Sequence, residues 1–287
     1  MDGVMADGVT AELHYQQLVP GKRVGRYINI PDGGELSDEH NVVKVHVQDG
    51  RKHLPDASLE KCGFELRQHV TACGDFKDSA AVTSTYYPEV EALVKAATGC
   101  ESVMVFDHTI RETSAVGLNV LGETAKAAAP VHRVHTDYSD ESAPKRLLDL
   151  AKTGSYTGRK LSEEEQAKLA KGRYVFINVW RSIGEGPALR CPLAVCDPGS
   201  IDYTKVVKYE MHYPDRVGSN FALEHDPDHK WYYYPKMVRD ECLLFKVYEK
   251  DDGGAFRSVF HTAFDDPTTP DDAPIRRSIE CRTIACF

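Results

Sequence analysis

Several features that mark other classes of protein are missing from this chain of 287 residues. No apolar run approaches the roughly 20 residues that a membrane-spanning helix needs, and the N-terminus lacks the basic-then-apolar pattern of a signal peptide. We therefore expect a cytoplasmic protein without a membrane segment. The net charge is −9 and no long basic stretch occurs, so a nucleic-acid partner is not expected either.

The eight cysteines form no CxxC pair. Cys191 and Cys196 are spaced too widely for a zinc knuckle, and so are Cys281 and Cys286. Because no secretory signal is found, we expect reduced thiols rather than disulfides. The paired aspartates at 265–266 and 271–272 are expected to be exposed loop charges.

The composition, with 41% hydrophobic and 28% charged residues, is typical of a globular protein, and the length fits a single domain over 1–287. The first 100 residues are predicted to form a mixed support. It has strands at 24–29 and 42–47, a helical stretch at 59–70 and a helix opened by Pro88. A β core is predicted over 101–287. It includes a mobile loop at 112–130 and a helical insertion at about 139–172, where Ser162 and Glu165 make a capping box.

The β signal is densest after residue 173. One face of 173–181 carries Tyr174, Phe176, Asn178 and Trp180, and the other carries Val175, Ile177 and Val179. Further short strands are predicted at 193–196, 220–225, 231–234, 242–248, 257–261 and 278–287. Because no helix-length segments separate them, the pattern predicts a mainly β fold with flanking helices, as a sandwich, jelly roll or barrel.

His135 and Asp137 lie two residues apart in a predicted strand at 131–138 and would share one face of it. The pair alone is weak evidence for a metal site, because a chain with 12 histidines is expected to contain one His-x-Asp motif by chance. His261, in a late predicted strand, supplies a second imidazole. Together they would form a two-histidine, one-carboxylate metal site, the ligand set of non-haem Fe(II) oxygenases.

Arg276 and Ser278 are also spaced to share a strand face. The planar guanidinium group of an arginine suits the distal carboxylate of a metal-bound 2-oxo acid. The serine hydroxyl would form a hydrogen bond with the same carboxylate. The ordered set of ligands, arginine and serine is what an Fe(II)/2-oxoglutarate site requires. Arg277 and Arg282 remain alternatives to Arg276.

Five segments, at 106–111, 177–181, 192–197, 231–235 and 276–282, resemble the hydroxylase/desaturase family of secondary metabolism. That family includes a component of cephamycin 7-alpha-methoxylation, proteins described as gibberellin desaturases, and fungal pathway oxygenases. The resemblance covers roughly residues 100–287. It implies a double-stranded β-helix core (a jelly roll, cupin-like), with Fe(II), 2-oxoglutarate and O₂. It also implies His135, Asp137 and His261 as the metal-binding, catalytic residues and Arg276 as the 2-oxoglutarate arginine.

The resemblance further implies oxidative decarboxylation of 2-oxoglutarate to succinate and CO₂, coupled to attack on an unactivated C–H bond. The substrate would be a small, anionic or amino-acid-derived metabolite, and the outcome hydroxylation, desaturation or ring closure. Ser278, Asn178 and Arg282 are further candidates for cofactor binding. Candidates for substrate binding are Tyr138, Trp180, Arg181, His108 and Arg111.

Two other functions remain open at this point. A cupin-like metalloenzyme that uses no 2-oxo acid would keep the histidines without needing Arg276. A non-catalytic β protein could bind a small molecule or serve a second protein as its partner subunit. The hydrophobic strand at 242–248 fits either a core or an interface, so a homodimer is also possible.

Overall fold

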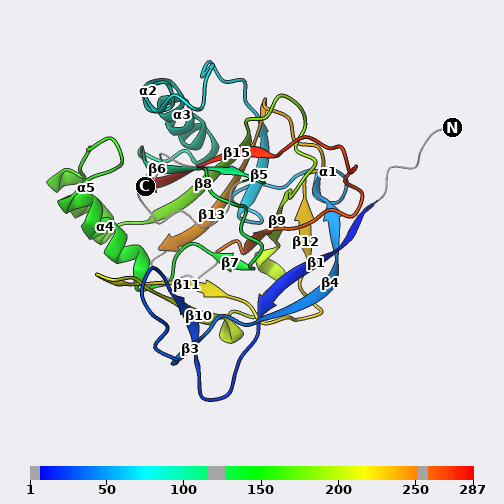
Figure 1. The fold of residues 1–287 in the computed structure, drawn as a ribbon. Helices are drawn as coiled ribbons and strands as arrows, with labels where there is room; N and C mark the ends of the chain where they lie inside the picture. The colour runs from blue at the N-terminus through cyan, green and yellow to red at the C-terminus, as the bar shows by residue number, and fades with distance from the viewer. Residues whose placement is uncertain (1–6, 115–126, 251–257) are drawn as a thin grey trace.

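The computed structural model describes residues 7–114, 127–250 and 258–287, and two curled β-sheets form most of it (Figure 1). The larger sheet has ten strands, in the order β1 (Gly8–Gln16), β4 (His40–Asp49), β12 (Trp231–Tyr233), β9 (Leu193–Cys196), β14 (His261–Ala263), β7 (His135–Thr136), β11 (Val217–Ala222), β10 (Val207–His212), β2 (Arg23–Tyr27) and β3 (Leu36–Ser37). The smaller sheet has the order β5 (Phe64–Gln68), β13 (Glu241–Lys250), β8 (Tyr174–Ser182), β15 (Arg277–Cys286) and β6 (Ser102–Glu112). The prediction of a mainly β fold is confirmed.

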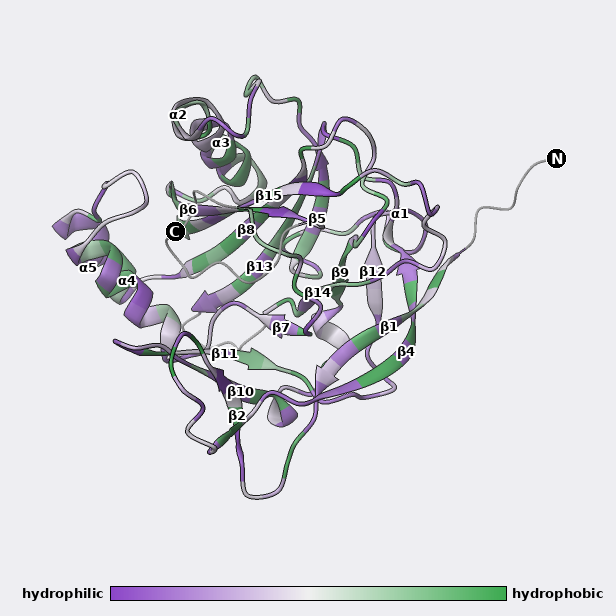
Figure 2. Cartoon of the chain, viewed as in Figure 1, coloured by the Kyte–Doolittle hydropathy of each residue, from purple (hydrophilic) through white to green (hydrophobic). Residues whose placement is uncertain are grey.

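The alternation predicted for β8 is confirmed, and it explains the layers of the molecule. Tyr174, Phe176 and Trp180 pack in the apolar core between the two sheets. Val175 and Ile177 belong to a second core, between the small sheet and the helices. Because β8 is covered on both faces, it is apolar along most of its length (Figure 2).

The helices flank the small sheet (Figure 1). One group covers its outer face and comprises α2 (Ser79–Ala81), a π-helical turn (Val82–Tyr86) and α3 (Tyr87–Thr98), which has Pro88 in its first turn as predicted. The predicted insertion holds α4 (Ser142–Lys152) and α5 (Glu163–Lys171), whose capping box of Ser162 and Glu165 is present. Both helices are amphipathic (Figure 2). The short α1 (Gly50–His53) follows β4.

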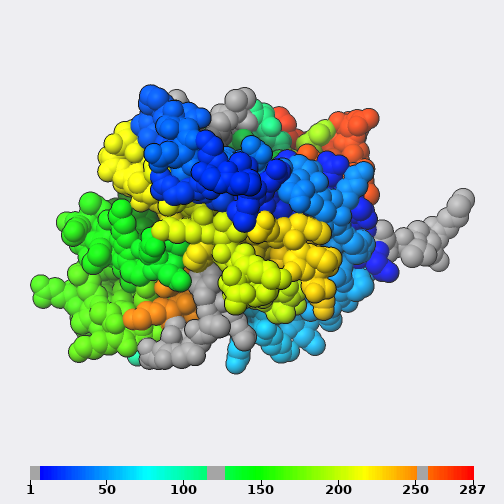
Figure 3. Space-filling model, turned by 90° about the horizontal axis from the view of Figure 1, so that it is seen from below, coloured from blue at the N-terminus to red at the C-terminus, as the bar shows by residue number. Residues whose placement is uncertain are grey.

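The N-terminal strands join the larger sheet. The two predicted strands there correspond to β2 and β4, whereas β1 was not predicted. The strand β10 was not predicted either. It pairs in parallel with β2, so segments far apart in sequence meet on one surface (Figure 3). Seen from below, the blue N-terminal segment lies against the yellow-green segment that holds β10 and β11.

Three predictions of local structure need correction. The helical stretch at 59–70 is wrong, because Gly63 adopts a positive φ of 75° and β5 follows, paired with β13. The strand at 131–138 is reduced to β7 alone. Of the strand predicted at 257–261, residue 257 lies outside the described residues, and the rest is strand only from His261. β6 extends to Glu112, while most of the loop predicted at 112–130 lies outside the described residues.

Among the residues described, no helix is both long and apolar enough to cross a bilayer. The eight cysteines, all of them described, are unpaired.

Candidate active site

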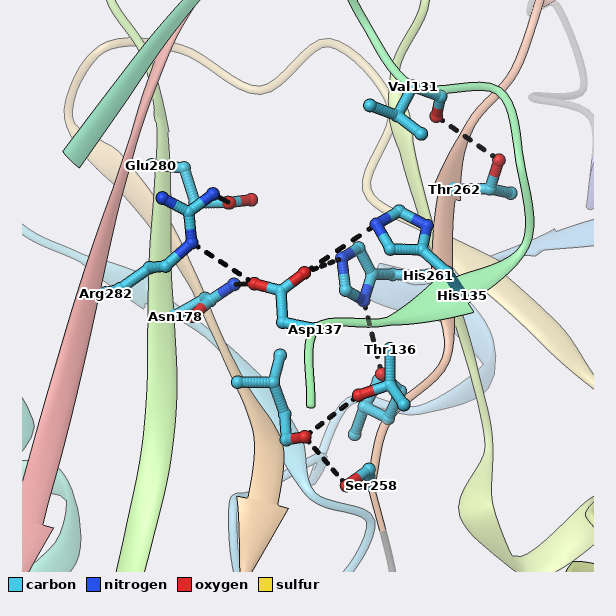
Figure 4. Close-up of polar contacts among 12 residues, drawn as sticks. Val131, His135, Thr136, Asp137, Asn178, Ser258, His261, Thr262, Glu280 and Arg282 are labelled. Atoms are coloured by element: carbon cyan, nitrogen blue, oxygen red, sulfur yellow. Dashed lines mark hydrogen bonds and ion pairs between the residues drawn. The ribbon is translucent and has the colours of Figure 1, made fainter. Parts of the chain in front are cut away.

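His135 and His261 face each other on neighbouring strands near the middle of the larger sheet. They are register partners in the pairing of β7 with β14, and their ring centroids lie 4.5 Å apart. Asp137 follows β7 and turns its carboxylate toward both rings (Figure 4). Its Oδ1 atom lies 3.7 Å from the Nε2 atom of each histidine. The three predicted ligands therefore converge, with their ligand atoms within 4.8 Å of one another.

Backbone carbonyls fix the orientation of the two imidazoles. The Nδ1 atom of His135 donates to the carbonyl of Arg133 at 2.6 Å, and that of His261 lies 3.3 Å from the carbonyl of Val259. A carbonyl only accepts, so the ring proton is on Nδ1 and the Nε2 lone pair faces Asp137. Burial lowers the pKa of His135 well below its usual range, which keeps this ring neutral.

Asp137 is held from the smaller sheet. Its Oδ2 atom accepts from the Nδ2 group of Asn178 at 2.8 Å and from the Nε group of Arg282 at 3.3 Å. Burial alone would raise the pKa of Asp137. The charge of Arg282, followed by the two histidines, outweighs that effect and holds the pKa well below its usual range.

The site thus presents one carboxylate and two imidazoles whose Nε2 atoms face it. The 3.7 Å separations are too long for hydrogen bonds, and the three ligand atoms lie close enough together to contact one metal ion. A facial set of two histidines and one carboxylate suits Fe(II) and leaves further coordination positions open. The residues present therefore fit the metal that the sequence predicts.

One cavity adjoins this cluster. Its walls are Arg111, Val131, His135, Asp137, Trp180, Leu193, His261, Ala263, Arg276 and Glu280. Arg276 is buried there and lies over the ring of Trp180, with 5.2 Å between the guanidinium carbon and the ring centroid. Its Nη2 group donates to Ser278 Oγ at 2.8 Å, as the spacing predicts, and its Nη1 group donates to the carbonyl of Cys191.

The side chains of the three candidate arginines point to different places in the structure. Arg277 turns away from the cavity to pair with Glu112 at 2.9 Å, and its side chain is 41% exposed. Arg282 is buried among carboxylates and donates to Asp107 at 3.0 Å as well as to Asp137. Of the three candidates, Arg276 alone lines the cavity, whereas Arg282 contacts Asp137 from behind.

Arg111 and Arg276 bring two guanidinium groups to the same cavity. Burial and, after it, the charge of Arg111 lower the pKa of Arg276 to about 10, so the group stays protonated at neutral pH. Arg111 also donates to the carbonyl of Ala129 at 2.8 Å. Two guanidinium groups in one buried cavity, which also contains the carboxylate of Glu280, favour a ligand that carries negative charge.

Trp180 and Arg111 are thus found in the wall of the cavity, but two other candidates for substrate binding lie on the far side of the small sheet. Arg181 follows Trp180 and so points the opposite way, where it donates to Tyr86 at 3.1 Å and to the carbonyl of His69 at 2.9 Å. His108 lies 2.8 Å from the hydroxyl of Tyr87 on α3. Strand alternation turns these two side chains away from the cavity, so the structure does not bring them to the candidate site.

Tyr138 is the third candidate that does not line the cavity. It is buried in the core between the sheets, with its ring 4.7 Å from that of Phe176. Because β7 ends at Thr136, Tyr138 does not belong to the strand in which it was predicted. Its structural role is packing.

Sequence reasoning missed Glu280, which lines the cavity and accepts from Arg282 at 3.2 Å. Arg276, Ser278, Glu280 and Arg282 follow one another at the two-residue period of a strand face, so the same pattern that pointed to Arg276 could have found it. Asp107 and Thr109, which hold Arg282 from β6, follow the same period. Val131, Leu193 and Ala263 carry no comparable signal.

Comparisons with known proteins agree with this geometry. A family model described as "YDMC: Oxidoreductase/YMDC permease-like domain" matches residues 15–286. The Fe(II)/2-oxoglutarate-dependent dioxygenase nvfI of Aspergillus novofumigatus is 32% identical over 289 residues, which cover 96% of this chain and 95% of nvfI. The alpha-ketoglutarate-dependent dioxygenase phiK of Fungal sp. is 30% identical over 265 residues, covering 90% of this chain and 91% of phiK. The chain belongs to this oxidoreductase family and, with these relatives, to the Fe(II)/2-oxoglutarate-dependent dioxygenases.

The predicted resemblance to hydroxylases and desaturases is confirmed as well. The hydroxylase/desaturase efuI of Hormonema carpetanum is 30% identical over 269 residues, covering 88% of this chain and 86% of efuI. Among solved structures, one of the iron and alpha-ketoglutarate-dependent endoperoxidase NvfI superimposes with a TM-score of 0.81 at 25% identity. That match covers 98% of this dioxygenase and 99% of NvfI, which confirms the jelly-roll class of the fold.

Proposed function

We propose that this dioxygenase couples the oxidative decarboxylation of 2-oxoglutarate to oxidation of an unactivated C–H bond in a small specialised metabolite. The observation that carries the proposal is the shared cavity. The buried His135, Asp137 and His261 cluster and the buried Arg276 line the same space. A cupin-like enzyme without a 2-oxo acid would have no use for that arginine.

Each part of the site then has a task. His135, Asp137 and His261 would hold Fe(II), which when bound would activate O₂ as the oxidant of both the 2-oxo acid and the substrate. Arg276 and Ser278 bind the distal carboxylate of 2-oxoglutarate. Asn178 and Arg282 hold Asp137 ionised and in place, as partners of metal ligands commonly do.

Arg111 and Trp180 are the residues that we assign to the substrate. Arg111 supplies a second positive charge to the cavity, which suits an anionic or amino-acid-derived metabolite. Trp180 supplies an apolar wall. Relatives carry the names hydroxylase/desaturase and endoperoxidase, so hydroxylation, desaturation and ring closure all stay within the proposal. The cytoplasmic location, the homodimer and the lack of a nucleic-acid partner also stay predictions.

An anaerobic titration of the metal-free protein with Fe(II), and then with 2-oxoglutarate, tests this function. The chelated 2-oxo acid should give a weak visible charge-transfer band. We expect no band in His261→Ala. In Arg276→Ala, half-saturation should need at least about tenfold more 2-oxoglutarate, the equivalent of one lost charge-assisted hydrogen bond.

Arg277→Ala is the matched control, because Arg277 adjoins Arg276 but pairs outside the cavity. It should titrate like the unmodified protein. If iron binds and no band forms, the 2-oxoglutarate assignment is lost and a cupin-like activity takes its place. If iron does not bind, the catalytic proposal itself fails.

A further inference from the structure

A second group of potential metal ligands lies beside the cavity. His132, Cys191 and Asp265 come from three segments, which precede β7, precede β9 and follow β14. The Asp265 Oδ1 atom lies 3.4 Å from His132 Nε2 and 3.3 Å from Cys191 Sγ. All three ligand atoms fall within 4.8 Å of one another. The fold therefore gathers an imidazole, a thiol and a carboxylate at one point.

These separations match those around a tetrahedral zinc ion. With bonds of about 2.3 Å to sulfur and about 2.0–2.2 Å to nitrogen and oxygen, neighbouring ligand atoms lie about 3.3–3.6 Å apart. The donor types point the same way, since a thiolate with an imidazole favours Zn²⁺ or Co²⁺ over Mg²⁺ or Ca²⁺. The Nε2 atom of His132 is screened from solvent and has no hydrogen-bond partner. A cluster held together only by hydrogen bonds would not explain why this imidazole lies beside Cys191 and Asp265.

Two further observations concern the ligands themselves. Cys191 adopts a positive φ of 45°, a conformation rarely found outside glycine, and this directs its side chain toward Asp265. The Asp265 side chain is 86% exposed, so a metal ion could reach the site from solvent. The next imidazole, that of His14, has its centroid 6.1 Å from the His132 ring.

We propose that His132, Cys191 and Asp265 form a second metal site, for a thiophilic divalent cation such as Zn²⁺, with a fourth position open to water. It is distinct from the cluster of His135, Asp137 and His261, which contains no sulfur. When the ion binds, the thiol of Cys191 becomes a thiolate and its proton leaves to solvent.

The site adjoins the wall that carries the 2-oxoglutarate arginine. The carbonyl of Cys191 accepts from Arg276. Val131, next to His132, lines the cavity, and so does Ala263, two residues before Asp265. The backbone also joins these two segments, because the Ala263 amide donates to the Val131 carbonyl at 2.8 Å. The same backbone that shapes the cavity therefore positions all three ligands.

Cobalt is the probe that separates the two sites. Metal-free protein is titrated with Co²⁺ under argon while absorbance is recorded from the near ultraviolet to the visible. Co²⁺ at the second site should give a thiolate-to-cobalt charge-transfer band, whereas Co²⁺ among two histidines and an aspartate has no sulfur ligand. We expect the sulfur band with two cobalt ions bound per chain, and we expect Zn²⁺ to abolish the band.

Cys191→Ser should remove the sulfur band and leave one cobalt ion bound. Cys62→Ser is the matched control, because Cys62 and Cys191 are the two partly exposed cysteines. It should keep the band. Asp265→Asn should weaken cobalt binding at the sulfur site by at least tenfold, and its exposure ensures that this variant folds. His261→Ala should keep the band, which makes the result independent of the iron site.

The proposal is overturned if saturating Co²⁺ gives no sulfur band in the unmodified protein. It is also overturned if the band survives in Cys191→Ser or disappears in Cys62→Ser. Unchanged affinity at the sulfur site in Asp265→Asn would contradict the proposed ligand set, even if Cys191→Ser failed to fold.

Discussion

Burial changes the chemistry of single side chains in this protein, and His108 is the clearest case. Its ring lies 2.8 Å from the Tyr87 hydroxyl, and burial lowers its pKa to about 4. In the unfolded chain a histidine takes up its proton near pH 6.5. The stability that His108 contributes is therefore complete above pH 6.5 and is lost as the pH falls toward 4, because the unfolded state binds the proton first.

We expect His108 to account for about 2–3 kcal/mol of the stability lost between pH 7 and pH 4.5. In His108→Asn, the difference between the free energies of unfolding at these two pH values should shrink by that amount, as measured with urea. His46→Asn, at an exposed histidine of β4, is the control and should keep the full difference. An equal difference in His108→Asn and the unmodified protein would contradict the argument.

At the scale of the element, β8 carries the site on one face and structural links on the other. Arg181 is fully buried and donates to Tyr86 and to the backbone carbonyls of His69 and Arg239. Replacing it with methionine removes these hydrogen bonds, of which the one to Tyr86 lies in the buried core. For Arg181→Met we expect a loss of about 3–5 kcal/mol in the free energy of unfolding, and no change in the KM for the substrate.

Urea unfolding measures the first effect and steady-state kinetics the second. Arg277→Met, at the exposed side chain of β15, should cost no more than about 1 kcal/mol. A large rise in the KM for substrate with unchanged stability would reverse the assignment and return Arg181 to the substrate site.

Several patterns local in sequence were read correctly, whereas the helical spacing at 59–70 was not. The alternation of β8 and the capping box of Ser162 and Glu165 follow from neighbouring residues, and so does the pairing of Arg276 with Ser278. β1 and β10 take their place through pairing with β4, β2 and β11, which no local pattern reveals. The division of the chain into a support over 1–100 and a core over 101–287 stays a prediction.

The prediction of the site from sequence was limited for the same reason, because its residues come together only through contacts between distant segments. Arg276, Arg277 and Arg282 are equivalent as sequence, and only the packing of the two sheets shows which one faces the cavity. His108 and Arg181 lie outside the cavity because each is on the opposite strand face from a residue at the site. His132, Cys191 and Asp265 come together from three distant segments, so the spacing of the cysteines could not reveal them.

At the scale of the molecule, the site lies where the two sheets meet. His135 and His261 belong to the larger sheet, whereas Asn178, which holds Asp137, belongs to the smaller one. A second link is the hydroxyl of Thr136, which donates to the carbonyl of Val247 at 2.9 Å (Figure 4). A metal ion at this junction restrains both sheets together, so its binding should stabilise the whole fold rather than one loop.

Mn²⁺, which does not undergo the iron chemistry, tests this coupling by thermal unfolding. An ion that binds only the folded state, at 100 times its Kd, adds about 2.7 kcal/mol to the free energy of unfolding. For a chain of this size that corresponds to a rise in Tm of about 4–5 °C. His261→Ala should lose the shift, and Cys191→Ser should keep it, since the sulfur site is separate. No shift in the unmodified protein, or a full shift in His261→Ala, would mean that the ion at the junction does not hold the sheets together.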